Sequence, residues 1–416
     1  MSKRWRIRIL LFLAVLGPGI ITANVDNDSG GIFTYSQAGA QFGYSLLWLL
    51  VPVTLALIVV QEMCARMGVV TGKGLSDLIR EEFGLRLTFV LMVLLVLVNY
   101  TNVVTEFIGI AGSLHLFHVT RFIAVPICAV LVWLLVFKGD YKSTEKIFLI
   151  ASMVYIAYVF AGVLAQPNWQ QALLASVTLP AKSAWRDKDY LYMAVGIVGT
   201  TIAPWMQFYL QSSVVEKGVR VQHYGASKLD VIVGCFFTDI IAWFIVVACA
   251  ATLFVHGMGA IQVPSDAAEA MRPLAGDYAF VLFAFGLFNA SLFAASILPL
   301  STAYTVCEGL GFESGVDKSF REAPFFYWLY TLLIAGGAVT VLVLPDADLI
   351  NFAIWSQVLN GVLLPVVIIL MLLLINRSDL MGKHKNSRLW NVIAWATSAI
   401  VIAMTAVMLW GMLPGH

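Results

Sequence analysis

The sequence predicts an all-α protein that crosses a membrane many times. Of its 416 residues, 60% are hydrophobic and 12% are charged, whereas an ordinary soluble domain carries about 25% charged residues. Apolar runs recur along the chain, each long enough, at about 20 residues, to cross about 30 Å of hydrocarbon as a helix. These observations exclude a water-soluble fold and predict one transmembrane domain over residues 1–416.

Eleven apolar runs give the expected membrane helices. They cover 9–39 (interrupted), 43–65, 87–113, 121–137, 146–165, 191–213, 229–255, 277–306, 325–344, 350–375 and 390–411. The basic and apolar start of the chain has the regions of a signal peptide, but it continues directly into a polar cluster. We therefore interpret it as an uncleaved first helix.

The basic residues predict the orientation of these helices. With a cytoplasmic amino terminus, all but five of the 25 Lys and Arg residues fall on the cytoplasmic side; the five are Arg121, Lys182, Arg186, Lys188 and Arg272. Cytoplasmic loops of membrane proteins carry this excess of positive charge. We expect an integral protein of a bacterial inner (plasma) membrane, with its carboxyl terminus on the extracytoplasmic side.

Two of the runs are interrupted near their middles. The first contains NVDNDSGG at 24–31 and the sixth contains GTTIAPWMQ at 199–207. They lie five runs apart, so a division into two halves of five helices places equivalent helices in opposite orientations. We expect inverted repeats over 9–165 and 191–375, with broken helices 1 and 6 at the centre and 390–411 as an additional helix.

The first interruption has the composition of a cation site. Asp26 and Asp28 lie within the run, where a charge near the bilayer centre costs at least about 2.5–3.5 kcal/mol. Gly30 and Gly31 interrupt the helix and free carbonyls, such as that of Val25. Carboxylates beside free carbonyls are the ligands of a hard cation. The alternative is a re-entrant turn capped by aspartates.

The sixth run is interrupted at Pro204. A proline has no amide proton and clashes with the preceding turn, so carbonyls near Thr200 lose their partners. A simple bend is the alternative explanation of a single proline. The symmetric relation between the two interruptions favours a binding site.

Further polar residues lie within the apolar runs. We expect Glu106 in the third run and Gln357 in the tenth to line the ion pathway, with Asn360 as a further source of neutral oxygen. For Glu62 and Asp239 we favour a structural role, in which they pair with helix ends, Arg66 or polar neighbours.

Several classes of function find no support in the sequence. The net charge of +1 gives no reason to expect nucleic-acid binding, and HExxH, GxSxG and Walker A motifs of enzymes are absent. The five cysteines show no metal-ligand spacing, and the six histidines fall in loops or at the ends of runs, which argues against a histidine proton relay. We expect no cofactor and no obligate protein partner. A scaffold or receptor without transport would not need aspartates at bilayer depth.

The segment GPGIITANVDNDSGGIFTYSQAGAQFGYSLLW at 17–48 resembles the first-helix region of the Nramp (natural resistance-associated macrophage protein) divalent-metal transporters. Asp28-Ser29-Gly30-Gly31 takes the place of the family's Asp-Pro-Gly-Asn motif. The resemblance thus implies that Asp28 is a metal ligand.

Two further segments extend this resemblance over essentially the whole chain. Ala203-Pro204-Trp205 corresponds to a Met-Pro-His motif, and SQVLNGVLLP at 356–365 is similar to a segment with a coordinating glutamine, here Gln357. The resemblance implies a LeuT-like fold of eleven transmembrane helices, in which Asp28, Gln357 and the carbonyls of Val25 and Thr200 hold the ion, with Glu106 nearby.

The departures from the family pattern change the ion that we expect the protein to prefer and the expected coupling of transport to protons. The family's soft methionine ligand is Ala203 and its asparagine ligand is Gly31, so the space around Asp28 is expected to be larger. This pattern resembles the Nramp-related magnesium transporters. The family's sixth-helix histidine corresponds to Trp205 and its third-helix aspartate to Val103, which implies uptake without proton coupling.

The sequence therefore favours a carrier that moves largely hydrated Mg²⁺, and also Mn²⁺, through a lipid bilayer. Two other transporters are the alternatives. One is a proton-coupled Mn²⁺/Fe²⁺ symporter of the ordinary Nramp type, which the missing histidines disfavour. The other is a sodium-coupled amino-acid carrier of the same fold, which two aspartates at the break disfavour because the substrate carboxylate would lie beside them.

Overall fold

A computed structural model describes residues 18–137, 153–257, 259, 261, 272–316 and 318–411. All regular structure in these residues is helical, which confirms the predicted all-α class. Among them, eight helices are long and apolar enough to cross a membrane. The protein is thus an integral membrane protein with a polytopic helical fold, and the total of eleven spans stays a prediction.

The helices follow the predicted runs closely. In the first part of the chain they are α2 (Pro18–Val25), α3 (Ser29–Phe42), α4 (Leu47–Thr71), α5 (Leu75–Phe83), α6 (Leu85–His115), α7 (Arg121–Phe137), α9 (Ile156–Leu164) and α10 (Trp169–Ala175). Residues 9–17 of the first run and 146–152 of the fifth lie outside the described residues. The interruption expected in the first run is the gap between α2 and α3.

The second part contains an equivalent interruption. Its α-helices are α11 (Lys188–Thr201), α12 (Pro204–Glu216), α13 (Tyr224–Cys249), α15 (Arg272–Leu310), α16 (Pro324–Val343), α17 (Leu349–Ile375), α18 (Ser378–Met381) and α19 (Arg388–Gly411). A π-helix, η3 (Ala250–Phe254), continues α13, and four short 3-10 helices join other elements: η1 (Ala184–Arg186), η2 (Val221–His223), η4 (Asp346–Asp348) and η5 (Gly382–His384).

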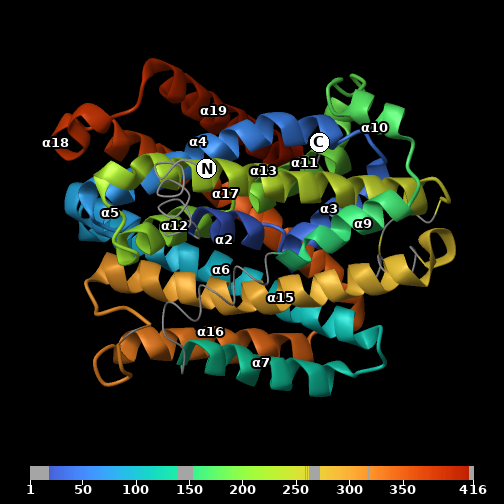
Figure 1. Ribbon diagram of the computed structural model, residues 1–416, viewed down its shortest axis with the longest axis horizontal. Coiled ribbons are helices and arrows are strands. Elements are labelled where there is room, and N and C mark those ends of the chain that lie inside the picture. The colour runs from blue at the N-terminus through green and yellow to red at the C-terminus, as the bar shows by residue number, and fades with distance from the viewer. Residues whose placement is uncertain are drawn as a thin grey trace, which may run out of the picture.

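The broken helices lie inside the bundle. In Figure 1, α2 runs through the middle of the molecule, between α13 and α6, while α15, α16 and α7 form one side of the bundle. Both α2 and α3 pack on α13, and α3 also packs on α17 and α11. The two interruptions are therefore shielded from lipid by surrounding helices.

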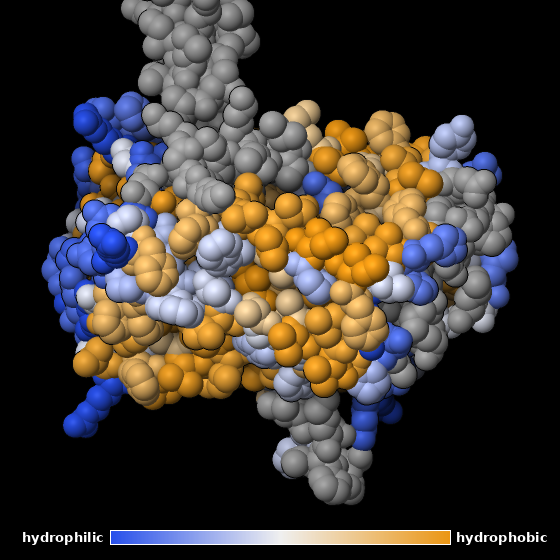
Figure 2. All heavy atoms as spheres, turned by 90° about the horizontal axis from the view of Figure 1, so that it is seen from below, coloured by the Kyte–Doolittle hydropathy of each residue, from blue (hydrophilic) through white to orange (hydrophobic). Residues whose placement is uncertain are grey.

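The surface agrees with a membrane location. Figure 2 shows apolar residues across the middle of one face and hydrophilic residues gathered at the two ends of the long axis. Large apolar side chains are exposed on the outer helices, such as Phe122 (63%) and Val130 (57%) on α7. Apolar surface of this extent is stable only when lipid covers it.

Glycines allow α11 and α17 to cross at backbone contact distance. A Cβ atom at Gly199 would lie 2.1 Å from the carbonyl oxygen of Gln357 and 2.5 Å from the amide nitrogen of Gly361. Helices in membranes commonly approach one another through small residues in this way. The contact fixes Gln357 of α17 against the end of α11.

We predict that Gly199→Ala destabilises the protein by about 1–3 kcal/mol, because the new methyl group meets backbone atoms that cannot rotate away. Thermal unfolding in detergent measures the effect. The control is Gly225→Ala on α13, where a Cβ atom would meet nothing within 4 Å. Equal melting temperatures for the two variants would contradict the close crossing of α11 and α17.

Candidate functional site

The first break places Asp28 at the amino-terminal end of α3. Asp28 is the N-cap residue: its backbone is extended (φ −69°, ψ −178°), and its Oδ1 accepts a 2.7 Å hydrogen bond from the amide of Gly31. A carboxylate here satisfies an amide that has no partner in the helix and interacts favourably with the helix dipole. Its side chain is buried, with 4% exposed.

The second break follows from Pro204. α11 ends at Thr201 and α12 begins at Pro204, so Ile202 and Ala203 separate them. Proline suits the first position of a helix, because the amide at that position has no helical partner. It also favours an extended conformation in the preceding residue, and Ala203 has φ −66° and ψ 137°. The break thus lies where the sequence predicts it.

Two carbonyls beside the breaks lose the amide that would pair with them in a continuous helix. Four residues after Thr200 comes Pro204, which has no amide proton. Four residues after Val25 comes Ser29, whose amide donates instead to Oε2 of Glu106 at 3.2 Å. The carbonyl oxygens of Val25 and Thr200 are therefore available to other partners, as a cation site requires.

The two breaks and α17 meet at Gly30 and Gly31. A Cβ atom at Gly31 would lie 2.5 Å from the carbonyl oxygen of Asp26 and 3.2 Å from Oγ1 of Thr200. A Cβ atom at Gly30 would lie 1.9 Å from Nε2 of Gln357. The structure thus brings the first break, the end of α11 and Gln357 together.

Glu106 lies on the other side of the first break. Its Oε2 accepts hydrogen bonds from the amide of Ser29 (3.2 Å) and from Oγ of Ser29 (2.9 Å), and this hydroxyl is also 2.6 Å from Oγ of Ser291. Glu106 is fully buried, and its carboxyl group lies within hydrogen-bonding reach of that of Asp28. Two carboxylates therefore stand at the amino-terminal end of α3.

A network of amide side chains holds Gln357. Its Oε1 accepts from Nδ2 of Asn360 at 2.8 Å, and Nδ2 of Asn360 also donates to Oδ1 of Asn102 at 3.1 Å. Asn102 donates in turn to Oδ1 of Asn360 at 3.0 Å. Sequence reasoning missed Asn102, although its position four residues before Glu106 on α6 puts both side chains on one face of that helix.

The extra space expected around Asp28 is absent on the Gly31 side. The carbonyl oxygen of Asp26 and the hydroxyl of Thr200 occupy the volume that a side chain at Gly31 would need. Oxygen atoms therefore replace the lost side chain. Ala203 and Trp205, which shape the second break, are also buried, with 3% and 1% exposed.

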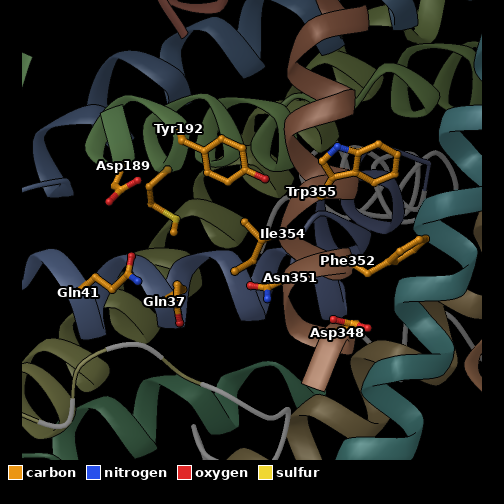
Figure 3. Close-up of a pocket in the computed structure, with 10 residues that line it drawn as sticks. Gln37, Gln41, Asp189, Tyr192, Asp348, Asn351, Phe352, Ile354 and Trp355 are labelled. Carbon is orange, nitrogen blue, oxygen red and sulfur yellow. The ribbon is translucent and has the colours of Figure 1, made fainter. Parts of the chain in front are cut away.

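A cavity of about 630 Å³ opens along the same three helices, and Figure 3 shows the side chains that line it. Gln37 and Gln41 come from α3, Asp189 and Tyr192 from α11, and the remaining labelled residues from η4 and α17. Gln37 is eight residues beyond Ser29, which corresponds to about 12 Å along the helix. The cavity thus lies between the first break and one end of the bundle, with carboxylates at Asp189 and Asp348.

Two other buried acids differ in their surroundings. Glu62 accepts from Arg66 at 3.1 Å and from the hydroxyl of Tyr224, so it forms the expected ion pair. Neither carboxylate oxygen of Asp239 has a hydrogen bond among the described residues, and Thr54 is its polar neighbour, so its structural role stays a prediction.

A sequence model of the family described as natural resistance-associated macrophage protein-like matches residues 19–411 of the chain. A protein named divalent metal cation transporter MntH, from Deinococcus radiodurans, is 28% identical over 422 residues, which cover 98% of this chain and 91% of that protein. A protein of the same name from Ralstonia nicotianae is 28% identical over 421 residues, which cover 97% and 92%. By name these relatives are transporters, not enzymes.

The fold is similar to that of solved transporter structures. The crystal structure of a manganese transporter from Eremococcus coleocola, in complex with an aromatic bis-isothiourea substituted compound, has a TM-score of 0.78 and 22% sequence identity. The similarity covers 98% of this chain and 87% of that one.

We predict that Ser29→Ala lowers the stability of the protein by about 1–3 kcal/mol, because the buried Glu106 carboxylate loses a hydroxyl donor. The control is Ser113→Ala on α6, a buried serine whose hydroxyl donates to the carbonyl of Ile110 on its own helix. Thermal unfolding of the two variants makes the comparison. A smaller loss for Ser29→Ala than for Ser113→Ala would show that Glu106 does not depend on this contact.

Proposed function

Since the chain belongs to the natural resistance-associated macrophage protein-like (Nramp) family, we propose that it transports divalent metal ions and binds them at the first break. Asp28 is the charged ligand, and Gln357 and the carbonyls of Val25 and Thr200 are neutral oxygen ligands. These groups, together with Glu106 beside them, are called the Asp28 site below. The meeting of two helix breaks around a buried aspartate is the observation that carries this proposal.

Mg²⁺ is the leading ion, with Mn²⁺ as a second substrate. The groups around Asp28 offer oxygen, and Ala203 stands where the resemblance places a soft thioether ligand. Mg²⁺ is usually held through one or two carboxylates and keeps several of its waters. An oxygen-only site with Asp28 as its ligand carboxylate suits this ion.

Ion binding and movement require local rearrangement. Gln357 packs over Gly30 and is bound to Asn360, so a partly hydrated ion displaces this amide when it reaches Asp28. The cavity shown in Figure 3 is the route of access, and its carboxylates raise the local cation concentration. The inverted repeats over 9–165 and 191–375 then rock against each other and expose the site to each side of a bacterial plasma membrane in turn. The amino terminus lies in the cytoplasm, and 390–411 is an additional helix.

Proton-coupled transport of Mn²⁺ or Fe²⁺ is the alternative, and a solved structure of similar fold is named a manganese transporter. The residues favour transport without protons, because Trp205 and Val103 stand where the resemblance places titratable side chains. Acidification inside proteoliposomes during Mn²⁺ uptake distinguishes the two. An unchanged internal pH supports uncoupled transport, and acidification supports the symporter.

We predict that Asp28→Ala reduces Mg²⁺ and Mn²⁺ flux into proteoliposomes by at least about tenfold, a loss equivalent to about 1.4 kcal/mol. Asp379→Asn is the control, because Asp379 is exposed on α18 and pairs with Arg377. Its flux should equal that of the wild type. Undiminished flux in Asp28→Ala would show that the ion binds elsewhere.

We predict that Ala203→Met shifts the preference of the protein toward Mn²⁺ and Cd²⁺ over Mg²⁺ by about tenfold, since a thioether favours softer cations. Ala203→Leu has a similar volume without sulfur and separates ligand chemistry from size. Competition of each ion against Mn²⁺ uptake gives the preference. If both variants change it equally, the missing methionine does not determine selectivity.

A further inference from the structure

Asp26 and Asp239 are buried acids with no place among the ligands proposed above. Asp26 lies between α2 and α3 with 2% of its surface exposed, and Asp239 lies on α13 with 5% exposed. Within the described part of the chain, none of their four carboxylate oxygens has a hydrogen-bond partner. Buried polar atoms almost always have partners, so this exception requires an explanation.

Their surroundings contrast with those of other buried acids. Asp230, on the same helix as Asp239, accepts a 2.7 Å hydrogen bond from the amide of Gly19. The hydroxyl of Thr54 lies near Asp239 but donates to the carbonyl of Leu50 at 2.7 Å, and the hydroxyl of Thr238 lies near Asp26 and accepts from Nδ2 of Asn27.

The segments that carry the two carboxylates lie side by side. Asn27, next to Asp26, donates through Nδ2 to the carbonyl oxygen (2.9 Å) and to Oγ1 (2.5 Å) of Thr238, the residue before Asp239. The linker between α2 and α3 therefore carries Asp26 to the level of Asp239 on α13.

Charge balance indicates what stabilises this pair. Among the described residues, no Lys or Arg forms an ion pair with Asp26 or Asp239. Two uncompensated carboxylates in the interior are strongly destabilising, whereas one divalent cation neutralises both.

The coordination available at the pair suits a hydrated ion. The described residues contain no group of three or more His, Cys, Asp or Glu side chains that could hold a metal, so water must complete the shell. Asp239 also lines a cavity of about 420 Å³ between α4, α10 and α13, and Thr54 is another polar residue on its wall. The other lining side chains are apolar, and several of them, such as Leu55 and Ile240, are exposed on the outer surface, so this cavity opens toward the lipid side.

We propose that Asp26 and Asp239 form a second divalent-cation site, beside the Asp28 site and on its α13 side. The ion is a hard one, Mg²⁺ or Mn²⁺, held by two carboxylates and water. The choice of Mg²⁺ or Mn²⁺ as the ion rests on the proposed function. The presence of a cation at Asp26 and Asp239 does not. Because the walls of the neighbouring cavity are mainly apolar, the ion reaches this second site from the Asp28 site.

Counting bound Mn²⁺ tests this second site. The full chain is purified in detergent, and the electron paramagnetic resonance signal of free Mn²⁺ gives the number bound at saturation. The expected numbers are two for the wild type, one for Asp239→Asn, one for Asp28→Ala and none for the double variant. Asp230→Asn removes a carboxylate from the same helix and should still bind two.

An unchanged number in Asp239→Asn would overturn the second site, whatever Asp28→Ala does. An unchanged number in Asp28→Ala, with one ion lost in Asp239→Asn, would instead overturn the Asp28 site and keep the second. If Asp239→Asn does not fold, anomalous diffraction from Mn²⁺-soaked wild-type crystals decides the question. A peak beside Asp239 supports the proposal, and a peak at Asp28 without one at Asp239 contradicts it.

Discussion

Backbone groups at a helix break inside a bilayer must find partners within the protein, because hydrocarbon offers none. The centre of this molecule is organised by that constraint. Asp28 and Glu106 accept the amides of Gly31 and Ser29 at the first break, and Pro204 removes an amide at the second. The carboxylates that we propose attract a cation are therefore also the groups that stabilise the break.

The same constraint explains the contacts around the site. Backbone atoms can serve as ligands only if helices approach closely, and Gly30 and Gly199 remove the Cβ atoms that would keep α3 and α11 away from α17. Asn360 satisfies the amide oxygen of Gln357. In the proposed function, an ion that binds at Asp28 exchanges these internal contacts for coordination, which would link binding to movement of α17.

The sequence predicts the helices and both breaks well, because apolar length, glycine pairs and Pro204 act locally. Contacts between distant helices are harder to predict. Asn102 can hold Gln357 only because α6 and α17 pack together. Asp239 lies beside Asp26 only because α13 packs against the linker between α2 and α3. The space beside Gly31 also depends on packing between distant segments, since the carbonyl of Asp26 and the hydroxyl of Thr200 lie where a side chain at this position would begin.

The distance between a bound ion and the Asp28 carboxylate is the most direct test of the account. In a high-resolution structure with Mg²⁺, we expect the ion at the first break, facing Asp28, with waters completing its octahedral shell; direct Mg²⁺–oxygen bonds measure about 2.0–2.1 Å. The hydrogen bond between the side chains of Gln357 and Asn360 should be broken. An ion bound away from both breaks, with Asp28 and Gln357 unmoved, would contradict the account.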